Sequence, residues 1–247
     1  MPWKWYDGVI QRIEDASSTT KRFWVEVPAE NTISFDAGQF ITMDLPISPK
    51  RLKRWRSYSI ANHPDDSNVL EFCIVKLEGG AGTTYLFEEA QIGTPIRFKG
   101  PSGAFVLPNE IDKDLVFVCT GTGVAPFRSM IGDLIQKKRA HQNIHLIFGT
   151  RYQEGVLYQE EFENWQQQLP NFKYSIALSR EAQLPSSDQI EYVKGYVHQI
   201  YQQHYAEVRP DVSFYLCGWS NMIDDAVAKL TTELGYDKSQ IHYELYG

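Results

Sequence analysis

Short segments in which apolar and polar residues alternate fill the first hundred positions of the chain. Each segment is rich in β-branched or aromatic residues and is bounded by Pro, Gly, Asp or Asn, which is typical of strands separated by turns. The pattern predicts six strands, over residues 9–17, 21–28, 38–46, 56–62, 70–76 and 94–101. Six short strands at roughly even spacing indicate a small antiparallel barrel. One helix, over 83–90, is expected to interrupt the series.

The pattern changes near Pro108, where continuous apolar segments replace the alternating ones. Residues 114–120 are typical of a strand buried on both faces, and a turn followed by an amphipathic helix is expected over 121–138. Further elements are predicted as strands at 143–150, 173–179, 212–218 and 241–247, and as helices at 157–169, 193–205 and 222–235. Alternating strands and helices favour a parallel, doubly wound sheet. We therefore predict a β-barrel domain over residues 1–109 and an α/β domain over residues 110–247.

Composition narrows the classes of function. The 247 residues are 43% apolar and carry a formal net charge of −7, which suits a folded protein and argues against nucleic acid as the main partner. Three cysteines, Cys73, Cys119 and Cys217, lie in apolar, strand-like segments without any C-x-x-C pair. The six histidines show no metal-binding motif. We therefore expect neither a disulfide framework nor a metal site.

From the sequence we expect neither a signal peptide nor a membrane-spanning segment. The N-terminal MPWKWYDG lacks the apolar core of a signal peptide, and no apolar run approaches the roughly 18 residues of a membrane helix. We expect a monomeric protein in a reducing, cytoplasmic setting.

The stretch TGTGVAP, Thr120 to Pro126, is placed between a buried strand and a helix. Its glycines let the backbone approach a ligand closely, and a helix N-terminus favours negative charge. The spacing is G-x-G-x-x-P rather than the full dinucleotide fingerprint, so a turn that only connects two elements is the alternative. Its position after the first strand of a doubly wound unit favours a ligand site.

Two stretches of the barrel also suit phosphate. Gly79 to Leu86, GGAGTTYL, can present backbone N–H groups and hydroxyls at a helix start, or can be a β-turn with Thr83 as the helix N-cap. In RSYS, Arg56 can contact a phosphate bidentately, Tyr58 can stack on a flat ring and Ser59 can hydrogen-bond a ring nitrogen. Taken alone, RSYS is equally a plain strand.

The order of the motifs is more specific than any one of them. RSYS, CIVK, GGxxT, the Gly100–Gly103 turn GPxG, TGTGVAP, YLCG with Met222 and a terminal ELY follow one another. In this order the chain strongly resembles the ferredoxin–NADP reductase superfamily, over nearly its whole length. That family joins a flavin-binding barrel to a nicotinamide-dinucleotide domain.

The resemblance implies that the barrel holds FAD. Arg56 would bind the pyrophosphate, Tyr58 would lie against the isoalloxazine and ribityl chain, and Ser59 would hydrogen-bond flavin N5, which accepts hydride. Other matched positions in the RSYS motif, along the ribityl and ribose, and in a second pyrophosphate cradle are Ser57, Ile74, Val75, Lys76, Gly80, Gly82 and Thr83.

The resemblance also implies that the second domain holds NADP(H). The matched turn and strand-end positions are Thr120, Gly121, Thr122, Gly123, Ala125, Pro126, Cys217, Gly218 and Met222. Glu244 and Tyr246 match the acidic residue and terminal aromatic of the plant-type branch, where the aromatic covers the flavin face until nicotinamide displaces it. The chain departs from that branch at Gly247, which follows the aromatic. Ser59, Cys217 and Glu244, from both domains, are the implied catalytic residues.

Three of these positions have plainer alternatives. Cys217 can be a small buried thiol, Tyr246 an ordinary chain terminus, and Lys76 a solvent-facing strand residue.

The leading hypothesis is an FAD-dependent reductase that moves hydride from NADPH to flavin and electrons to an acceptor. A stand-alone flavin or small-molecule reductase and an electron-transfer subunit of a larger complex are the alternatives. Preference for NADPH is expected because Ser179 and Arg180 follow a sheet strand without an acidic residue at either position. Lys194 and Tyr196 resemble the K-x-Y pair that holds the 2′-phosphate in plant-type members. A surface polar cluster is the alternative.

A cationic run precedes the flavin motif. Lys50, Arg51, Lys53 and Arg54 stand directly before the RSYS strand of an acidic chain. Such a run can steer an acidic one-electron carrier, a ferredoxin or flavodoxin, towards the cofactor edge. A solvated loop is the alternative.

Overall fold

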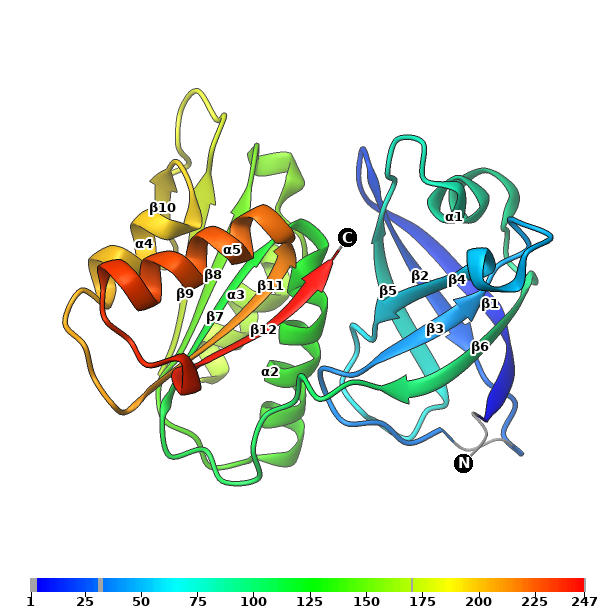
Figure 1. The fold of residues 1–247 in the computed structure, drawn as a ribbon, viewed down its shortest axis with the longest axis horizontal. Coiled ribbons are helices and arrows are strands. Elements are labelled where there is room, and N and C mark those ends of the chain that lie inside the picture. Colours follow the sequence, from blue (N-terminus) through cyan, green and yellow to red (C-terminus); the bar gives the residue numbers. More distant parts are fainter. Residues whose placement is uncertain (1–3, 31–32, 170, 247) are drawn as a thin grey trace. The chain divides into compact units, whose positions relative to one another are not determined.

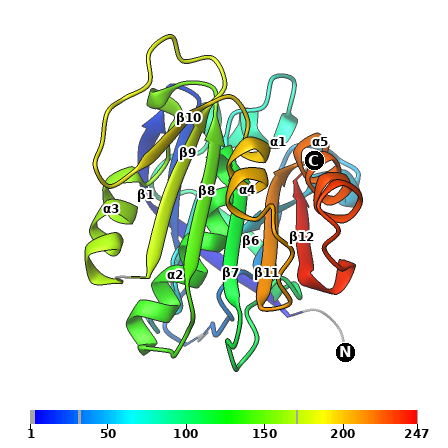
Figure 2. The same ribbon diagram turned by 90° about the vertical axis from the view of Figure 1, so that its left-hand side faces the viewer.

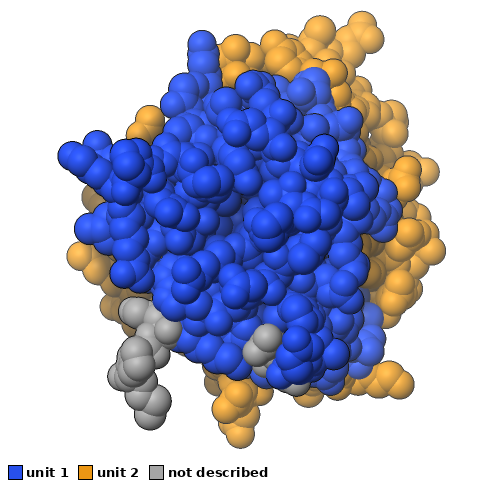
Figure 3. Space-filling model, turned by 90° about the vertical axis from the view of Figure 1, so that its right-hand side faces the viewer, with its two compact units in different colours: residues 1–107, 125–136 blue, residues 108–124, 137–247 orange. Residues whose placement is uncertain are grey.

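The structure is a computed structural model that describes residues 4–30, 33–169 and 171–246. Its contacts divide the chain into two compact units, coloured separately in Figure 3. The first comprises residues 1–107 and 125–136, and the second comprises residues 108–124 and 137–247. A helix from the middle of the chain therefore belongs to the first unit.

The first unit is built on a six-stranded antiparallel sheet in the order β4-β3-β6-β1-β2-β5. Its strands are β1 (Trp5–Ser17), β2 (Thr20–Glu26), β3 (Phe40–Asp44), β4 (Trp55–Ser59), β5 (Val69–Val75) and β6 (Pro95–Ser102). Burial alternates along β1, where Tyr6, Gly8 and Ile10 face the core and the residues between them face solvent. The two outer strands of the sheet meet where Ala61, just beyond β4, donates its N–H to the Glu71 carbonyl of β5.

Two helical segments complete the first unit. The short α1 (Ala81–Thr84) continues into a π-helical turn, Tyr85–Glu89, whose Leu86 is buried in the barrel core. The longer α2 (Ala125–Lys137) packs its Phe127 against Phe105. A helix at 83–90 was predicted, and it begins two residues earlier and changes its hydrogen-bond pattern after its first turn.

The second unit contains a six-stranded parallel sheet in the order β10-β9-β8-β7-β11-β12. Its strands, seen side by side in Figure 2, are β7 (Asp114–Thr120), β8 (Ile144–Thr150), β9 (Phe172–Leu178), β10 (Glu191–Lys194), β11 (Val212–Trp219) and β12 (Ile241–Tyr246). Successive strands β7 to β10 step one way, and β11 and β12 lie on the other side of β7. The strand order therefore reverses between β7 and β11, which is where α/β proteins bind ligands.

Helices cover both faces of this sheet. α4 (Val197–His204) and α5 (Ser220–Ala228) bury Ile200, Tyr201 and Ile223 against one face. α3 (Gln159–Gln168) packs Phe162 against Tyr174 on the other face, with ring centroids 5.4 Å apart. Figure 1 shows the two sheets and their helices. The predicted fold, an antiparallel barrel followed by a doubly wound parallel sheet, is confirmed.

Several predicted boundaries were wrong. The first strand, predicted from Val9, begins at Trp5. The predicted helix 193–205 begins with two residues of β10, and α4 starts only after Gly195, whose φ of +131° ends the strand. The predicted helix 222–235 ends as α5 at Ala228 and continues as a π-helical turn, Lys229–Glu233. The predicted strand 56–62 ends at Ser59; Ile60 makes one more hydrogen bond beside β3, to the Gln39 carbonyl, and Ala61 turns to Glu71 of β5. Gly247 lies outside the described residues.

Among the described residues, no helix has both the length and the apolar character needed to span a membrane.

Candidate functional site

The RSYS motif forms most of β4, and its side chains differ in how far they are exposed to solvent. Ser57 is exposed, Tyr58 is half-buried and packs against the barrel core, and Ser59 is 5% exposed. Burial raises the pKa of the Tyr58 hydroxyl to about 12, against an opposing effect of the Arg56 charge. The phenol is therefore neutral at physiological pH and can donate a hydrogen bond.

Arg56 lies against the glycine-rich loop. Its Nη1 donates to the carbonyls of Trp55 at 2.7 Å and Lys53 at 3.1 Å, which fixes the guanidinium at the start of β4. A Cβ at Gly82 would lie 2.9 Å from Arg56 Cγ and 3.2 Å from its Nε. A side chain at position 82 would therefore displace the Arg56 side chain from this place. The structure thus brings together Arg56 and Gly82, which the sequence analysis assigned to two separate cradles.

The loop before α1 is held by its own threonine. Leu77 N–H donates to Thr83 Oγ1 at 3.1 Å, and this hydroxyl lies 3.0 Å from the Gly80 carbonyl. The N-cap of α1 is Gly80, so Thr83 as the N-cap was wrong. Because the hydroxyl stabilises the loop, the backbone N–H groups of the first turn are the better candidates for contacting an anion.

The CIVK segment ends β5. Ile74 is buried, Val75 is half-buried, and both pair with β2. Lys76 is exposed, its N–H donates to the Thr19 carbonyl, and its Nζ lies 2.7 Å from the Glu88 carboxylate. The side chain of Lys76 therefore faces solvent, which favours the plainer of its two interpretations.

These barrel residues fit a diphosphate-containing ligand. A guanidinium supplies paired donors for phosphate, and a side-chain-free glycine beside it allows the backbone to come close. The half-buried phenol and the buried serine hydroxyl stand on the same strand.

Two glycine turns interlock at the switch point of the parallel sheet. β7 ends in a 3₁₀ turn, Gly121–Val124, in which a Cβ at Gly123 would lie 2.3 Å from the Cys217 carbonyl of β11. Conversely, a Cβ at Gly218, whose φ is +143°, would lie 2.4 Å from Thr120 Oγ1. Neither position has room for a Cβ, because the backbone of β11 packs on Gly123 and the Thr120 hydroxyl packs on Gly218. Both glycines are buried, and they join the ends of β7 and β11 at the position where doubly wound sheets bind ligands.

Other predicted nucleotide positions are mostly buried. Gly121 has a φ of +53°, Thr122 is half-buried, and Ala125 and Pro126 are the buried first residues of α2. Met222 packs in the hydrophobic core of the second unit, beside Ile223. Its burial gives it a packing role whether or not a nucleotide is bound.

Cys217, Glu244 and Tyr246 are brought together by the pairing of β11 with β12. Cys217 is the direct parallel partner of Glu244, and Trp219 is the partner of Tyr246. Burial, followed by the Glu244 charge, raises the pKa of the Cys217 thiol, and a hydrogen bond from Tyr246 acts in the opposite direction. The thiol is therefore protonated and uncharged at neutral pH.

The positions predicted to contact the adenosine end also share one edge of the sheet. Ser179 and Arg180 follow β9, and their N–H groups donate to the carbonyls of Thr150 and Arg151 at the end of β8. Lys194 is the last residue of β10 and pairs with Leu178, while Tyr196, 68% exposed, precedes α4. Arg151, which was not predicted from the sequence, directly follows β8 and lies beside Arg180 at this edge, because its carbonyl accepts the Arg180 N–H.

The cationic run folds as a 3₁₀ turn, Arg51–Arg54, in front of β4. Arg54 is paired with Asp44, at 2.8 Å, and so differs from its exposed neighbours Lys50, Arg51 and Lys53. Two further cations join these three. Arg97 lies over the Trp5 ring at 5.0 Å and Lys99 over the Trp55 ring at 4.0 Å, while Arg51 contacts both rings. We call Lys50, Arg51, Lys53, Arg97 and Lys99 the basic surface.

The described residues include no group of three or more His, Cys, Asp or Glu side chains that could hold a metal ion. The cysteines at 73, 119 and 217 are all buried, and none of them forms a disulfide with another described residue.

Comparisons with known proteins agree with this arrangement. The oxidoreductase FAD-binding domain matches residues 7–107, and the oxidoreductase NAD-binding domain matches residues 117–228. Ferredoxin–NADP reductase B of Sorangium cellulosum is 33% identical over 86% of this chain and 85% of its own. The phenol hydroxylase P5 protein of Acinetobacter pittii is 32% identical over 98% of this chain, which spans 65% of that longer protein.

The fold also matches a solved structure. A ferredoxin NADP+ reductase from Neisseria gonorrhoeae, with FAD and NADP bound, superposes with a TM-score of 0.80 over 98% of each chain at 22% identity. Two family domains in the expected order, and a relative that is matched over most of its length, carry the assignment. This chain belongs to the ferredoxin–NADP reductase superfamily.

Proposed function

We propose that the protein is an FAD-dependent reductase that takes a hydride equivalent from NADPH and delivers electrons to an acceptor protein. In this proposal residues 1–109 form the FAD domain and residues 110–247 the NADP(H) domain. The observation that carries it is a pair of glycine-made close approaches, Gly82 against Arg56 and Gly123 against the Cys217 carbonyl. The first suits a diphosphate, and the second lies at the switch point of a doubly wound sheet.

The barrel residues would bind and orient the flavin. The Arg56 guanidinium would pair with the pyrophosphate, together with N–H groups of the loop at Gly80–Thr83. The Tyr58 ring would pack against the flavin, and the Ser59 hydroxyl would hydrogen-bond N5. Bound FAD supplies the hard chemistry, because it accepts hydride from a nicotinamide and releases electrons singly.

The residues of β11 and β12 would tune the surroundings of the nicotinamide. A protonated Cys217 thiol presents no negative charge to the ring, so Glu244 would be the nearby anion that stabilises developing positive charge. No covalent bond to Cys217 is required. Tyr246 would cover the flavin until the nicotinamide takes its place.

The donor is NADPH in this proposal. Arg151, Arg180 and Lys194 stand at the ends of three adjacent strands, β8, β9 and β10, where three cations suit a 2′-phosphate. Glu181 is the nearest acidic residue in sequence to Arg180, and its carboxylate accepts the Gln153 N–H at 2.9 Å. That hydrogen bond holds Glu181 to the neighbouring loop.

The acceptor would be an acidic one-electron carrier of the ferredoxin or flavodoxin kind. The basic surface offers five cations on a chain whose net charge is −7, so an acidic partner would be steered to it. We propose that the protein works as a monomer in the cytoplasm, where its cysteine thiols stay reduced.

A second candidate is the electron-transfer component of an oxygenase. The toluate 1,2-dioxygenase electron transfer component of Pseudomonas putida, 29% identical over 98% of this chain, favours it. A stand-alone flavin reductase is a third candidate, but the Arg56–Gly82 cradle argues for a tightly bound prosthetic group rather than a flavin substrate.

Purification of the chain alone tests the proposal. We expect a yellow protein that contains FAD and oxidises NADPH with ferricyanide as acceptor. A colourless protein that reduces added free flavin would establish the stand-alone flavin reductase instead. Activity that requires a co-purifying oxygenase would establish the second candidate.

A further inference from the structure

The antiparallel sheet closes at a short join between its two outer strands, β4 and β5. Ala61, two residues past the end of β4, donates its N–H to the Glu71 carbonyl at 2.8 Å, whereas Ile60 before it still donates to the Gln39 carbonyl beside β3. The side chain of Asn62 extends this pairing, because its Nδ2 donates to the Val69 carbonyl at 2.9 Å and its Oδ1 accepts the Glu71 N–H at 2.8 Å. We call Ala61, Asn62, Val69 and Glu71 the barrel seam. An amide side chain here continues a ladder that the backbone has left.

Helix α2 completes the hydrogen bonding of the seam. Arg128 Nη1 donates to the Ala61 carbonyl at 2.8 Å, and Ser129 Oγ donates to the Asn62 carbonyl at 2.7 Å. These two carbonyls belong to residues outside regular strand pairing, and Ser129 is fully buried. Buried carbonyls need donors, so α2 supplies what a neighbouring strand would otherwise provide.

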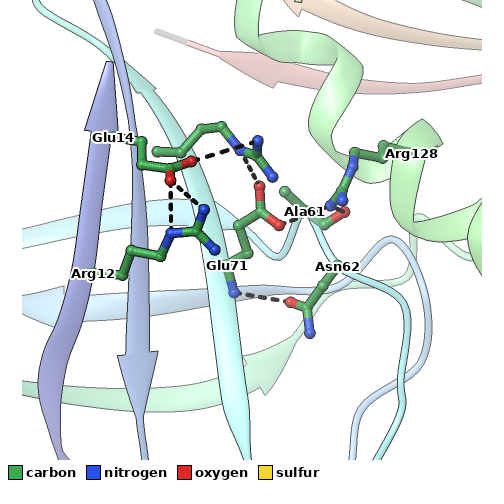
Figure 4. Close-up of polar contacts among 7 residues, drawn as sticks. Arg12, Glu14, Ala61, Asn62, Glu71 and Arg128 are labelled. Atoms are coloured by element: carbon green, nitrogen blue, oxygen red, sulfur yellow. Dashed lines mark hydrogen bonds and ion pairs between the residues drawn. The ribbon is translucent and has the colours of Figure 1, made fainter. Parts of the chain in front are cut away.

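The carboxylate of Glu71 joins the seam to two arginines. Its Oε2 lies 3.0 Å from Arg128 Nη1, and its Oε1 accepts from Arg22 Nε at 2.6 Å. The Glu71 side chain is 3% exposed and that of Arg128 is 12% exposed. A buried carboxylate is stable only when it is paired and hydrogen-bonded. Arg22 continues the network to the surface, where Glu14 links it to Arg12 (Figure 4).

The seam adjoins both segments that the proposed function assigns to the flavin. Ser59 precedes Ala61 on the same strand end, and Ile74 follows Glu71 along β5. β4 is an outer strand of the sheet, with β3 on one side. The seam holds the end of β4 from its other side.

We propose that Glu71 and Arg128 are positioning residues of the flavin site, which lock the seam and so hold Ser59 at flavin N5. This inference rests on the proposed function. It assigns no contact with FAD to either residue. A shift of about 1 Å in a reacting group costs on the order of 100-fold in rate, so a loosened seam would slow hydride transfer without releasing FAD.

Three variants with FAD bound separate positioning from general stability. Arg128→Met breaks the seam, Arg128→Lys keeps a cation near Glu71 and Ala61, and Arg22→Met removes the other guanidinium from the same carboxylate without touching a seam carbonyl. We expect flavin reduction at saturating NADPH to fall about 10-fold or more in Arg128→Met. Arg128→Lys should recover most of that loss, and Arg22→Met should stay within about twofold of the wild type. The FAD dissociation constant should be similar in all three.

Two measurements do not depend on turnover. The midpoint potential of the flavin should shift in Arg128→Met and remain in place in Arg22→Met. In the apoprotein, amide hydrogen exchange at Ala61 and Glu71 should accelerate in Arg128→Met and not in Arg22→Met. If Arg128→Met does not fold, Ser129→Ala, which removes one seam bond, should show the same exchange effect to a smaller degree.

Equal reduction rates, potentials and exchange in the Arg128 and Arg22 variants would overturn the inference while leaving the proposed function intact. A wild-type protein without FAD would end both proposals. A wild-type protein that holds FAD but is not reduced by either nicotinamide would end the proposed donor reaction, while the potential and the exchange rates would still decide the role of the seam.

Discussion

Arg56 is the residue on which FAD binding should depend most. It is held by two carbonyls at the start of β4 and packed on Gly82, so its guanidinium is already oriented before a ligand arrives. Arg56→Ala should remove charge-assisted contacts worth roughly 1.5–3 kcal/mol each and weaken FAD binding about 10- to 100-fold, measured by fluorescence titration of the apoprotein. Arg12→Ala, which removes an exposed guanidinium elsewhere on the barrel, is the control. Unchanged FAD affinity in Arg56→Ala would refute the assignment.

Ser59 should affect the reaction rather than FAD binding. Its hydroxyl is small, buried and proposed to face the atom that accepts hydride. In Ser59→Ala we expect FAD to stay bound and the stopped-flow rate of flavin reduction to drop by about 10-fold or more. Thr42→Val removes a hydroxyl from the neighbouring strand β3 and should not slow reduction. A Ser59→Ala rate equal to that of the wild type removes Ser59 from the mechanism.

His145 makes stability depend on pH. Its ring is hydrogen-bonded to Tyr205 and Ser175, and burial, with the nearby Lys173 and His204 charges, lowers its pKa to about 3. The unfolded chain takes up this proton near pH 6.5 and the folded chain does not, so stability falls as pH drops from about 6.5 towards 3, by up to ~1.4 kcal/mol per pH unit.

Urea unfolding at pH 7 and pH 5 measures this slope. His145→Gln, which cannot titrate, should lose less stability between the two pH values than the wild type. Equal losses in the two proteins would show that His145 does not govern the acid sensitivity.

At the scale of elements, the sequence predicted strands well where burial is periodic and poorly where it is not. β7 and β8 are continuous apolar runs and were placed within a residue or two. β10, EYVK, is a short outer strand without such a run, and its Glu191 is held by Ser175, Lys173 and His204 rather than by a core. These partners are distant from β10 in the sequence, so no local sequence pattern predicts the contacts.

The candidate site divides in the same way. RSYS and TGTGVAP were recognisable because glycines and a fixed residue order mark them. The contact of Arg56 with Gly82, and the addition of Arg97 and Lys99 to the cationic run, depend on strands that meet only in the fold. The role of Glu71 could not be predicted from the sequence. Its carboxylate lies inside an apolar strand, and only the fold brings the two arginines that pair with it.

The ends of β8, β9 and β10 should decide which nicotinamide nucleotide is used. If Arg151 and Arg180 hold the 2′-phosphate, kcat/KM should favour NADPH in the wild type. The double variant Arg151→Ala, Arg180→Ala should lose about 10- to 1000-fold for NADPH, with NADH nearly unaffected, because two charge-assisted contacts are removed. NADH serves as the internal control. A wild-type preference for NADH would contradict the proposal.

At the scale of the whole molecule, the basic surface should control how fast an acidic acceptor is reduced. Substitution of Lys50, Arg51 and Lys53 by Glu should sharply slow the reduction of an acidic ferredoxin at low salt. Reduction of a small neutral quinone, measured without ferricyanide, should stay nearly unchanged. The wild-type advantage should shrink above about 0.1 M salt, where the screening length is about 10 Å.

Arg54 stays unchanged in this variant, because its pairing with Asp44 makes it part of the turn rather than of the basic surface. If both proteins reduce the ferredoxin equally at low salt, the run is only a solvated turn.

The membership of α2 in the first unit bears on how the chain is made. A ribosome delivers the six barrel strands well before residues 125–136, which supply Arg128 and Ser129. During synthesis the carbonyls of Ala61 and Asn62 therefore lack those donors at first. The barrel can be completed only after β7 and the glycine turn have also left the ribosome. A gene fragment that stops after residue 109 reproduces that unfinished intermediate, and one that includes α2 encodes the helix that completes it.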